Sequence, residues 1–385
     1  MRLSDFTEIN PYEKLPKGTI AKKISMEQLE PYKKFVSGYS LEAYSGGAKF
    51  RNGDTIMARI TPCLENGKTA FVSTLEKSEV GFGSTEYIVF RAKDGISHPD
   101  FVYYLVISSL VREPAIKSMV GSSGRQRVQQ TVIDELEIPN YSLAEQQHIV
   151  DILGSIDEKI EFFDKQIYLL EKQGQLLYQN VFESSEVETE KVNLSKIATF
   201  QNGYSYSGEE LCETSIDCLA TIKNFDRQGG FKIEGFKPIK VVGKIKPEMY
   251  AEIGDLLIAH TDLTQNADII GNPALLLNTS KYKHVVISMD LVKVKSNTLS
   301  NELLYYILKS DKFKGHALGY CSGTTVLHLN KKALQEYVFD MPIDKVVVSQ
   351  LDEKLTTIFK RIKIALKETE GLKKLKQLYL QKFFG

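Results

Sequence analysis

Cysteine is scarce in this chain of 385 residues, and its few cysteines are not arranged as a metal or redox site. None of the four belongs to a C-x-x-C pair or has metal-ligand spacing with a histidine; they are Cys63, Cys212, Cys218 and Cys321. Free thiols in a reducing compartment are therefore expected. The sequence has no apolar run of 18 residues, and its start, MRLSDFTEIN, is acidic and polar. We expect a cytoplasmic protein that does not bind a membrane.

Net charge and catalytic motifs are absent as well. Lysine and arginine together number 49, as do aspartate and glutamate, so the chain is not basic throughout, although a local basic cleft stays possible. We find no G-x-x-x-x-G-K-[ST] loop, no G-x-G-x-x-G that opens a helix, no H-E-x-x-H and no G-x-S-x-G. The Asn/Asp-Pro-Pro-aromatic segment of an adenine methyltransferase is missing too. We therefore expect no catalytic residue, no cofactor and no metal.

The chain instead contains an internal repeat. A chain of this length favours two or more domains, and a repeat decides what those domains are. Four short blocks recur in the same order at offsets of 199 to 203 residues: 52–61 with 253–262, 103–104 with 305–306, 123–124 with 322–323, and 138–139 with 341–342. The same scaffold is therefore expected twice.

Each half ends in a long helical pattern. The segments 142–145 and 349–352 are typical of capping boxes. After each of them, apolar residues recur at alternating spacings of four and three, as in a coiled coil. The first series is Ile149, Leu153, Ile156, Ile160, Phe163, Ile167, Leu170, Gly174, Leu177 and Val181. The second series is Leu351, Leu355, Ile358, Ile362, Ala365, Thr369, Leu372, Lys376, Tyr379 and Phe383.

The two series also predict a register. If the helices pack antiparallel, the numbers of facing residues add up to 532, so that Phe163 faces Thr369. Lys376 then faces Ile156 near one end of the seam, where its ammonium group is expected to reach water. At 1.5 Å per residue, each helix would be roughly 50 Å long.

About 140 residues precede each helix, and they predict an α+β domain with a sheet. Apolar runs such as TIMARI, EYIVFRA, LLIAH and MDLVKV indicate strands, whereas 100–118 and 301–315 indicate helices. The polar stretch ESSEVETEK at 183–191 is typical of a linker. We expect the domains and helices to divide the chain as 1–141, 142–183, 184–348 and 349–385.

Long blocks of the first half resemble a known family. They are FRNGDTIMARITPCLENGKTAFV at 50–72, GFGSTEYIVFRAKDGISHPDFVYYL at 81–105, GSSGRQRV at 121–128 and IPNYSLAEQQHIV at 138–150. In this order they resemble the target recognition domain of the specificity subunit of type I restriction–modification systems. The second half, with FQNGYSYSGEEL at 200–211 and AEIGDLLIAHTD at 251–262, resembles a second, divergent domain of this kind.

The resemblance implies an architecture and a function. Two repeated α+β target recognition domains would be separated by two long helices that form an antiparallel coiled coil with pseudo-two-fold symmetry. Such a subunit is not an enzyme. It binds double-stranded DNA, reads one half of a bipartite site with each domain, and carries two methyltransferase subunits, which modify adenine at N6. Two motor-nuclease subunits join the full complex. The second helix departs from the commonest family pattern, because Thr369 and Lys376 occupy seam positions.

The alternatives belong to other classes. A non-catalytic coiled-coil scaffold of another defence complex would need no pair of divergent loops, and a remnant subunit would have lost its partners. Sequence readout requires donors and acceptors that match base edges. The DNA-binding candidates of the first half are Arg59, Lys68, Ser123, Arg125, Gln126 and Arg127. Those of the second half are Tyr204, Tyr206, His260, Thr261, Thr324, Thr325 and His328.

Each candidate also has a purely structural interpretation. Arg59 could pair with Glu65 or Glu86, and Lys68 could be a solvated surface charge. His260 could cap the end of a strand. The two tyrosines could be core aromatics, and the candidates near the end of the second half could merely flank a strand.

Overall fold

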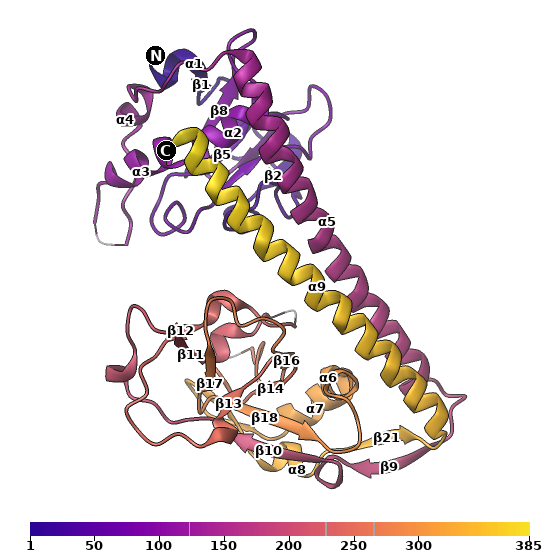
Figure 1. The fold of residues 1–385 in the computed structure, drawn as a ribbon. Helices are drawn as coiled ribbons and strands as arrows, with labels where there is room; N and C mark the ends of the chain where they lie inside the picture. The colour runs from indigo at the N-terminus through magenta and orange to yellow at the C-terminus, as the bar shows by residue number, and fades with distance from the viewer. Residues whose placement is uncertain (123, 228, 265) are drawn as a thin grey trace. The chain divides into compact units, whose positions relative to one another are not determined.

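The computed structural model describes residues 1–122, 124–227, 229–264 and 266–385 (Figure 1). The chain divides into two compact units. Unit 1 consists of Met1–Phe162 with Glu370–Gly385, and unit 2 of Phe163–Thr369. Two helices of 40 residues each, α5 (Leu143–Phe182) and α9 (Lys345–Phe384), contribute a part to both units.

Unit 1 contains two four-stranded sheets in its described residues. The first has the order β1 (Thr7–Ile9), β8 (Tyr87–Ala92), β5 (Thr55–Ala58) and β6 (Thr69–Phe71), all antiparallel. The second has the order β3 (Ser40–Ala43), β2 (Ile20–Ile24), β7 (Gly81–Gly83) and β4 (Lys49–Phe50). Besides α5 and α9, its helical segments are α1 (Leu3–Phe6), η1 (Met26–Gln28), α2 (Pro99–Ile107), α3 (Ser109–Lys117) and α4 (Gln130–Asp134).

The first sheet of unit 1 is buried on both faces. Met57 of β5 packs into a core with the aromatic residues of α2, whereas the neighbouring Ile56 packs into a core beneath the second sheet. Successive side chains of a strand point to opposite faces, so a strand between two layers must be apolar throughout. This explains the run TIMARI, and it makes unit 1 a layered α+β domain as the sequence predicts.

Unit 2 repeats this layering. Its inner sheet has the order β10 (Ala198–Asn202), β18 (Leu291–Ser296), β14 (Leu256–Ala259) and β16 (Pro273–Leu275). A second sheet has the order β12 (Lys237–Pro238), β11 (Asp217–Ala220), β17 (His284–Ile287) and β13 (Tyr250–Ala251). The side chains of β14 alternate between a helix-facing core and a core under the second sheet, as those of β5 do.

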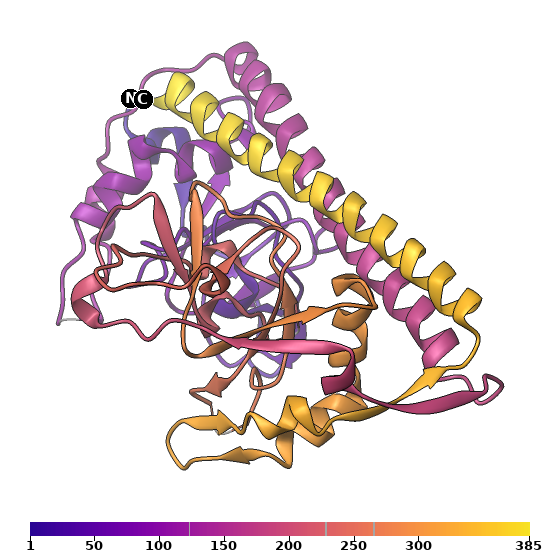
Figure 2. The ribbon, with the colours of Figure 1, turned by 60° about the horizontal axis from the view of Figure 1, so that its bottom comes forward.

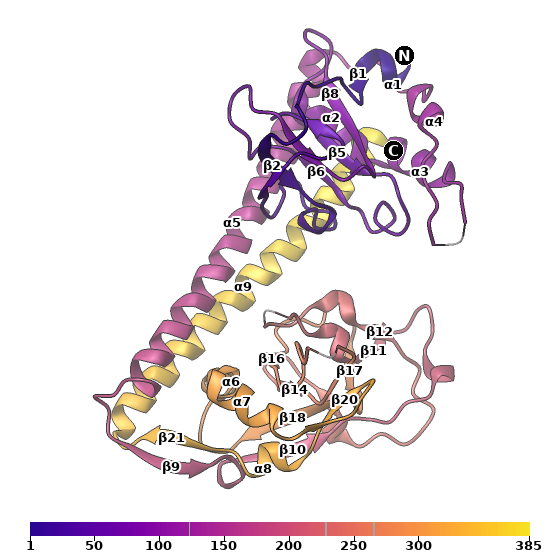
Figure 3. The ribbon, with the colours of Figure 1, turned by 180° about the vertical axis from the view of Figure 1, so that it is seen from behind.

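Two small sheets complete the described part of unit 2 (Figure 3). They are β15 (Thr261–Asp262) with β20 (Leu327–Leu329) and β19 (Cys321–Ser322), and β21 (Val338–Pro342) with β9 (Thr189–Asn193). Its other helical segments are η2 (Leu194–Lys196), η3 (Gly208–Glu210), η4 (Ile222–Asn224), η5 (Ile233–Gly235), η6 (Pro247–Met249), α6 (Asn301–Lys309), α7 (Asp311–Leu318) and α8 (Lys332–Gln335).

The segment expected as a linker, 183–191, is partly a strand. Its last three residues belong to β9, which pairs antiparallel with β21 just before α9 begins (Figure 2). The start of unit 1 makes a similar pairing, because Arg2 forms a bridge with Glu137 just before α5. The sequence did not predict this strand because most of its side chains are polar or charged, and both faces of an exposed two-stranded ribbon can be polar.

The start of α5 is as expected. The backbone N–H of Ser142 donates to Glu145 Oε2 at 2.8 Å, and the N–H of Glu145 donates to Ser142 Oγ at 3.3 Å. This reciprocal capping box satisfies two backbone donors that a helix start leaves without a partner.

The start of α9 differs from the prediction. The helix begins at Lys345, and Asp344 Oδ1 accepts the backbone N–H groups of the first turn at 2.8 and 3.3 Å. Ser349 therefore lies inside the helix, and the capping box expected there is wrong. The carboxylate of Asp352 instead accepts the backbone N–H of Ser300 at 3.0 Å, at the start of α6. Asp352, which the local pattern assigned to a helix cap, therefore makes a tertiary contact instead.

The helices pack antiparallel within unit 1. His148 of α5 lies beside Phe383 of α9, with ring centroids 6.4 Å apart, and the Asp157 carboxylate contacts the Lys376 ammonium at 2.6 Å. The paired numbers add up to 531 and 533, close to the expected 532. In the part of the seam that unit 1 contains, the expected direction is therefore correct.

The expectation for Lys376 is wrong. The side chain does not reach water but is 6% exposed, and its Nζ forms an ion pair with Asp157, which is 7% exposed. Tyr104 donates its hydroxyl to the same carboxylate at 2.8 Å and also accepts from Lys34 Nζ at 3.2 Å. The ammonium of Lys376 lies over the rings of Tyr103 and Tyr104 as well. Burial lowers the pKa of Lys376, against the opposing attraction of Asp157.

At the positions of unit 2 that correspond to this buried ion pair, the residues are uncharged. At an offset of 202, Asp157 corresponds to Phe359, Tyr104 to Tyr306, and Lys376 to Gly174. Phe359 packs on Tyr306 with ring centroids 5.9 Å apart, and a Cβ on Gly174 would lie 2.0 Å from the Tyr306 hydroxyl. Glycine is therefore required here for close approach, and the two units use different chemistry in one scaffold.

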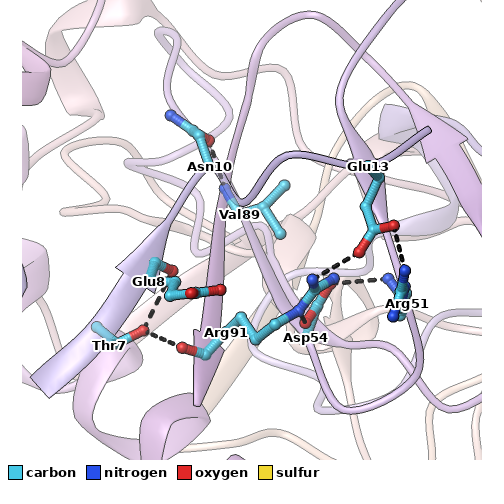
Figure 4. Close-up of polar contacts among 8 residues, drawn as sticks. All are labelled: Thr7, Glu8, Asn10, Glu13, Arg51, Asp54, Val89 and Arg91. Carbon is cyan, nitrogen blue, oxygen red and sulfur yellow. Dashed lines mark hydrogen bonds and ion pairs between the residues drawn. The ribbon is translucent and has the colours of Figure 1, made fainter. Parts of the chain in front are cut away.

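The repeated blocks share a Gly-Asp pair, Gly53-Asp54 in the first half and Gly254-Asp255 in the second, and Asp54 has a structural role in unit 1 (Figure 4). Asp54 is buried and accepts from Arg91 Nε and Nη2 at 2.7 and 2.6 Å. Arg91 also donates to Glu13, which in turn contacts Arg51, both at 2.6 Å. Burial raises the pKa of Asp54, whereas the hydrogen bonds from Arg91 oppose this shift. The network fixes the N-terminal segment to β5 and β8, and thereby positions the ends of these strands.

Candidate nucleic-acid interface

Three charged residues of unit 1 meet where β5 ends. Arg59 directly follows β5, Glu86 directly precedes β8, and Arg127 follows the loop after α3. The Arg127 guanidinium donates to the Glu86 carboxylate from Nε at 2.9 Å and from Nη2 at 2.6 Å. The hydrogen bond from Arg127 lowers the pKa of Glu86, and both arginines add to this electrostatically. Both effects favour the ionised form of the carboxylate, which is in direct contact with Arg127.

The loop before Arg127 is held by backbone bonds. Val120 and Arg127 form an antiparallel bridge, which brings the two ends of this segment together. Gly121 has φ +139°, and a Cβ there would lie 2.8 Å from the Arg125 carbonyl oxygen, which explains the glycine. Arg125 is exposed, and Gln126 is half-buried. The predicted residue Ser123 lies outside the described residues.

Two predicted residues of unit 1 also have backbone contacts. Arg59 donates from Nη2 to the carbonyl of Val128 at 3.2 Å, whereas its Nε is buried without a hydrogen-bond partner in the described part of the chain. Lys68 donates to the carbonyl of Met26 at 2.7 Å. That contact fixes the Lys68 side chain to the start of η1, which follows β2.

Unit 2 carries an equivalent arrangement around Asp290. His260 directly follows β14, Asp290 directly precedes β18, and His328 lies in β20. The Asp290 carboxylate accepts the Thr261 hydroxyl at 3.2 Å. Burial lowers the pKa of His260, as do Lys331 and His328, whereas Asp290 opposes the shift.

The same two backbone hydrogen bonds hold each site together, and we call these bonds the backbone frame of the site. In unit 1 the N–H of Arg59 donates to the Glu86 carbonyl at 2.9 Å, and the N–H of Val128 donates to the Arg59 carbonyl at 2.9 Å. In unit 2 the N–H of His260 donates to the Asp290 carbonyl at 2.7 Å. The N–H of the residue after His328 donates back to the His260 carbonyl at 2.9 Å. One frame thus presents Arg, Glu and Arg in unit 1, and His, Asp and His in unit 2.

The remaining candidates of unit 2 are two threonines and two tyrosines. Thr324 and Thr325 are exposed in the turn between β19 and β20. Tyr206 is half-buried, and burial, followed by the charge of Asp290, raises its pKa. Tyr204 donates its hydroxyl to Glu210 at 2.7 Å and packs, like Tyr206, against the small core of Leu219, Ile239 and Val286.

Glu86 and Asp290 were not among the predicted site residues. A signal for them exists, because an acidic residue directly precedes the apolar run of an inner strand in both halves. The offset between them is 204 rather than 201, so the alignment of neighbouring blocks did not bring them together. Only the fold shows that they occupy one position.

The chemistry of these sites is hydrogen bonding and charge. The described residues contain no group of three or more His, Cys, Asp or Glu side chains that could hold a metal ion. In the described part of the chain, no helix combines the length and apolar composition that a membrane span requires. Guanidinium, imidazole, hydroxyl and carboxylate groups at strand ends can read base edges, because each matches a donor or acceptor there.

Comparisons with known proteins concern the family and the fold of the chain. Residues 1–172 match the family model of the type I restriction modification DNA specificity domain. Over 329 residues the chain is 26% identical to the type I restriction enzyme MjaVIII specificity subunit of Methanocaldococcus jannaschii, covering 77% of this chain and 75% of that protein. Over 105 residues it is 35% identical to the EcoAI specificity subunit of Escherichia coli, covering 27% of this chain and 18% of that protein.

The fold has a solved relative as well. A crystal structure of the S subunit of a type I restriction–modification system from M. genitalium matches with a TM-score of 0.57 and 15% sequence identity. The match covers 100% of this chain and 95% of that chain. At this identity the likeness concerns the fold.

Proposed function

Because the chain belongs to the family of specificity subunits of type I restriction–modification systems, we propose that it reads a bipartite DNA site, one half with each unit. DNA sequence recognition is the function of the family, and family members are not catalytic. The observation that carries the bipartite proposal is the repeated frame at the strand ends, which presents Arg, Glu and Arg in one unit and His, Asp and His in the other. Equal frames with unequal side chains suit two half-sites of different sequence.

We assign the reading surfaces to residues 1–141 and 184–348, as target recognition domains. The helices 142–183 and 349–385 then act as spacers that separate the half-sites. The DNA is double-stranded, and phosphate contacts from exposed lysine and arginine side chains supply affinity without sequence preference.

The long helices offer a surface for the methyltransferase subunits. On α5, the exposed residues Phe162, Leu169 and Leu176 recur every seven positions, and on α9 Ile364 and Leu378 occupy the equivalent places. Exposed apolar side chains in a row on a helix are typical of a protein interface. We propose that each stripe docks one of two methyltransferase subunits, and that two motor-nuclease subunits join the complex for restriction.

Domain exchange tests the bipartite reading. Residues 1–140 are replaced by the equivalent domain of a related subunit, and methylation-sensitive sequencing is applied to DNA from a host that carries the complete system. One half of the methylated sequence is expected to change, while the other half and the spacing stay. A folded chimaera that changes both halves, or a wild-type complex without any sequence preference, would contradict the proposal. The second outcome is what a coiled-coil scaffold would give.

A single residue tests the first reading surface. Arg125→Ala is expected to weaken specific binding by about 1–3 kcal/mol and to relax preference in one half-site only. Lys77→Ala, which removes another exposed cation of unit 1, serves as the control. Equal discrimination by Arg125→Ala and the wild type on half-site variants would remove Arg125 from the reading surface.

A further inference from the structure

A carboxylate at a DNA-reading surface requires an explanation, because DNA phosphates repel it. Glu86 and Asp290 nevertheless occupy one equivalent position, directly before the inner strands β8 and β18. The backbone carbonyls of both residues accept from the residue that directly follows the neighbouring strand, at 2.9 and 2.7 Å. The repeat has therefore kept an acidic side chain at this place while the basic residues around it changed.

The contact of Glu86 with Arg127 uses one edge of the guanidinium group. Nε lies 2.9 and 3.0 Å from the two carboxylate oxygens, and Nη2 lies 2.6 Å from Oε1. A guanidinium group has five N–H donors in a plane, and this contact occupies the Nε–Nη2 edge. The Nη1 donors and the second Nη2 donor form another edge, which these contacts leave to other acceptors.

The free edge has the geometry that guanine requires. Arginine reads guanine by donating two parallel hydrogen bonds to O6 and N7. The side chain of Arg127 is 48% exposed, so it can reach a partner. The side chain of Glu86 is less accessible, at 22%. A fixed guanidinium plane also loses less rotamer freedom on binding than a mobile one.

We propose that Glu86 is a specificity-determining positioning residue, which holds Arg127 by its Nε–Nη2 edge so that the Nη1–Nη2 edge reads a guanine in the half-site of unit 1. The inference rests on the proposed function and names the base. The carboxylate also disfavours contact of Arg127 with phosphate, because a phosphate at the same guanidinium would come close to a like charge. Unit 2 has histidines in place of both arginines, so this guanine requirement belongs to one half-site alone.

The experiment uses the complete complex and its methylated sequence. The half-site of unit 1, identified by domain exchange, should contain an invariant guanine. Glu86→Gln keeps the size of the side chain but removes its charge. It is expected to lower the preference for guanine over other bases at that position about tenfold, the scale of one bidentate contact. It should also steepen the salt dependence of non-specific DNA binding, because the released Arg127 can contact a phosphate.

A double variant separates positioning from a general loss of structure. If Glu86 acts through Arg127, Glu86→Gln in an Arg127→Ala background changes the preference no further, and both single variants lose preference at the same base. Arg127→Lys should lose it too, since lysine cannot donate in a fixed fork. Asp290→Asn is the matched substitution in unit 2. It is expected to leave the guanine preference in the half-site of unit 1 as in the wild type. Circular dichroism melting checks the fold of each variant.

The possible outcomes distinguish a failure of the proposed function from a failure of the role proposed for Glu86. A wild-type complex without a defined bipartite sequence would overturn the proposed function, and the role of Glu86 with it. A defined sequence whose first half lacks guanine, or full guanine preference in Glu86→Gln, would overturn the role of Glu86 and leave the proposed function intact. Additive losses in the double variant would likewise show that Glu86 does not act through Arg127.

Discussion

The buried ion pair between Lys376 and Asp157 gives the sharpest test of how the helices attach to unit 1. Lys376→Met keeps the length and the apolar stem of the side chain and removes only the ammonium group. The Asp157 carboxylate then keeps one of its two hydrogen-bond partners, the Tyr104 hydroxyl at 2.8 Å. A charge that is 7% exposed is left without a counter-charge in contact.

The expected magnitude follows from this geometry. Breaking a buried pair by removing one partner costs about 3–5 kcal/mol, because the remaining charge is desolvated. We expect a loss of about 3 kcal/mol, at the lower end of that range, because Tyr104 still donates to the carboxylate. The double variant Asp157→Phe with Lys376→Gly copies the residues of unit 2 and removes both charges. It should be more stable than Lys376→Met by about 2 kcal/mol, even though glycine costs a helix about 1 kcal/mol.

The assay must resolve the two units, since a single unfolding transition is not expected for a chain of two units. The chain has no tryptophan, so fluorescence offers no simple reporter. Hydrogen exchange measured by mass spectrometry in increasing urea gives the opening free energy of individual peptides. Peptides from α2, Pro99–Ile107, report on unit 1, and peptides from α6, Asn301–Lys309, are the internal control. If Lys376→Met lowers the opening free energy of α2 by less than about 1 kcal/mol, the ion pair does not stabilise unit 1 as argued.

Two further predictions concern unit 2. Gly174→Ala is expected to destabilise it by about 1–3 kcal/mol, because the new Cβ would lie 2.0 Å from the Tyr306 hydroxyl, and the same exchange measurement on α6 should show this. Burial lowers the pKa of His260 below the value of about 6.5 that an unfolded histidine has. Between these two values the unfolded chain binds more protons, so the stability of unit 2 should fall as the pH falls through this window and be fully present above it. His260→Gln should flatten the decline, and equal slopes for wild type and variant in urea titrations from pH 5 to 8 would refute this.

The sequence predicted the elements that repeat and that have a period. The Tyr103–Tyr104 and Tyr305–Tyr306 pairs recur because both lie in buried helices, α2 and α6, against equivalent sheets. Buried residues of the two series, among them Ile149, Leu153, Leu355 and Ile362, follow the heptad because one face of each helix is covered. The resemblance to type I specificity subunits and the α+β fold class with long helices are confirmed. The residue boundaries of the domains and the DNA-binding residues stay predictions.

What the sequence could not show depends on distant partners. Asp157 and Lys376 are 219 residues apart, and Glu86 and Arg127 are 41 apart. A charged residue at a seam position has two solutions, a path to water or a buried counter-charge, and no local pattern distinguishes them. For Lys376 the prediction of a path to water was wrong, because the buried counter-charge of Asp157 comes from a distant part of the chain.

The division of unit 1 along the chain has a consequence for synthesis. Phe384 is buried in the core of unit 1, where its ring lies 5.6 Å from that of Phe101 and 5.9 Å from that of Tyr141. A ribosome makes all of unit 2 before it makes this residue, so unit 2 is complete first although unit 1 begins the chain. During translation the aromatic residues around Phe101 stay accessible to chaperones. A chain interrupted after residue 369 would contain every residue of unit 2 but would lack the Phe384 ring that covers this core of unit 1.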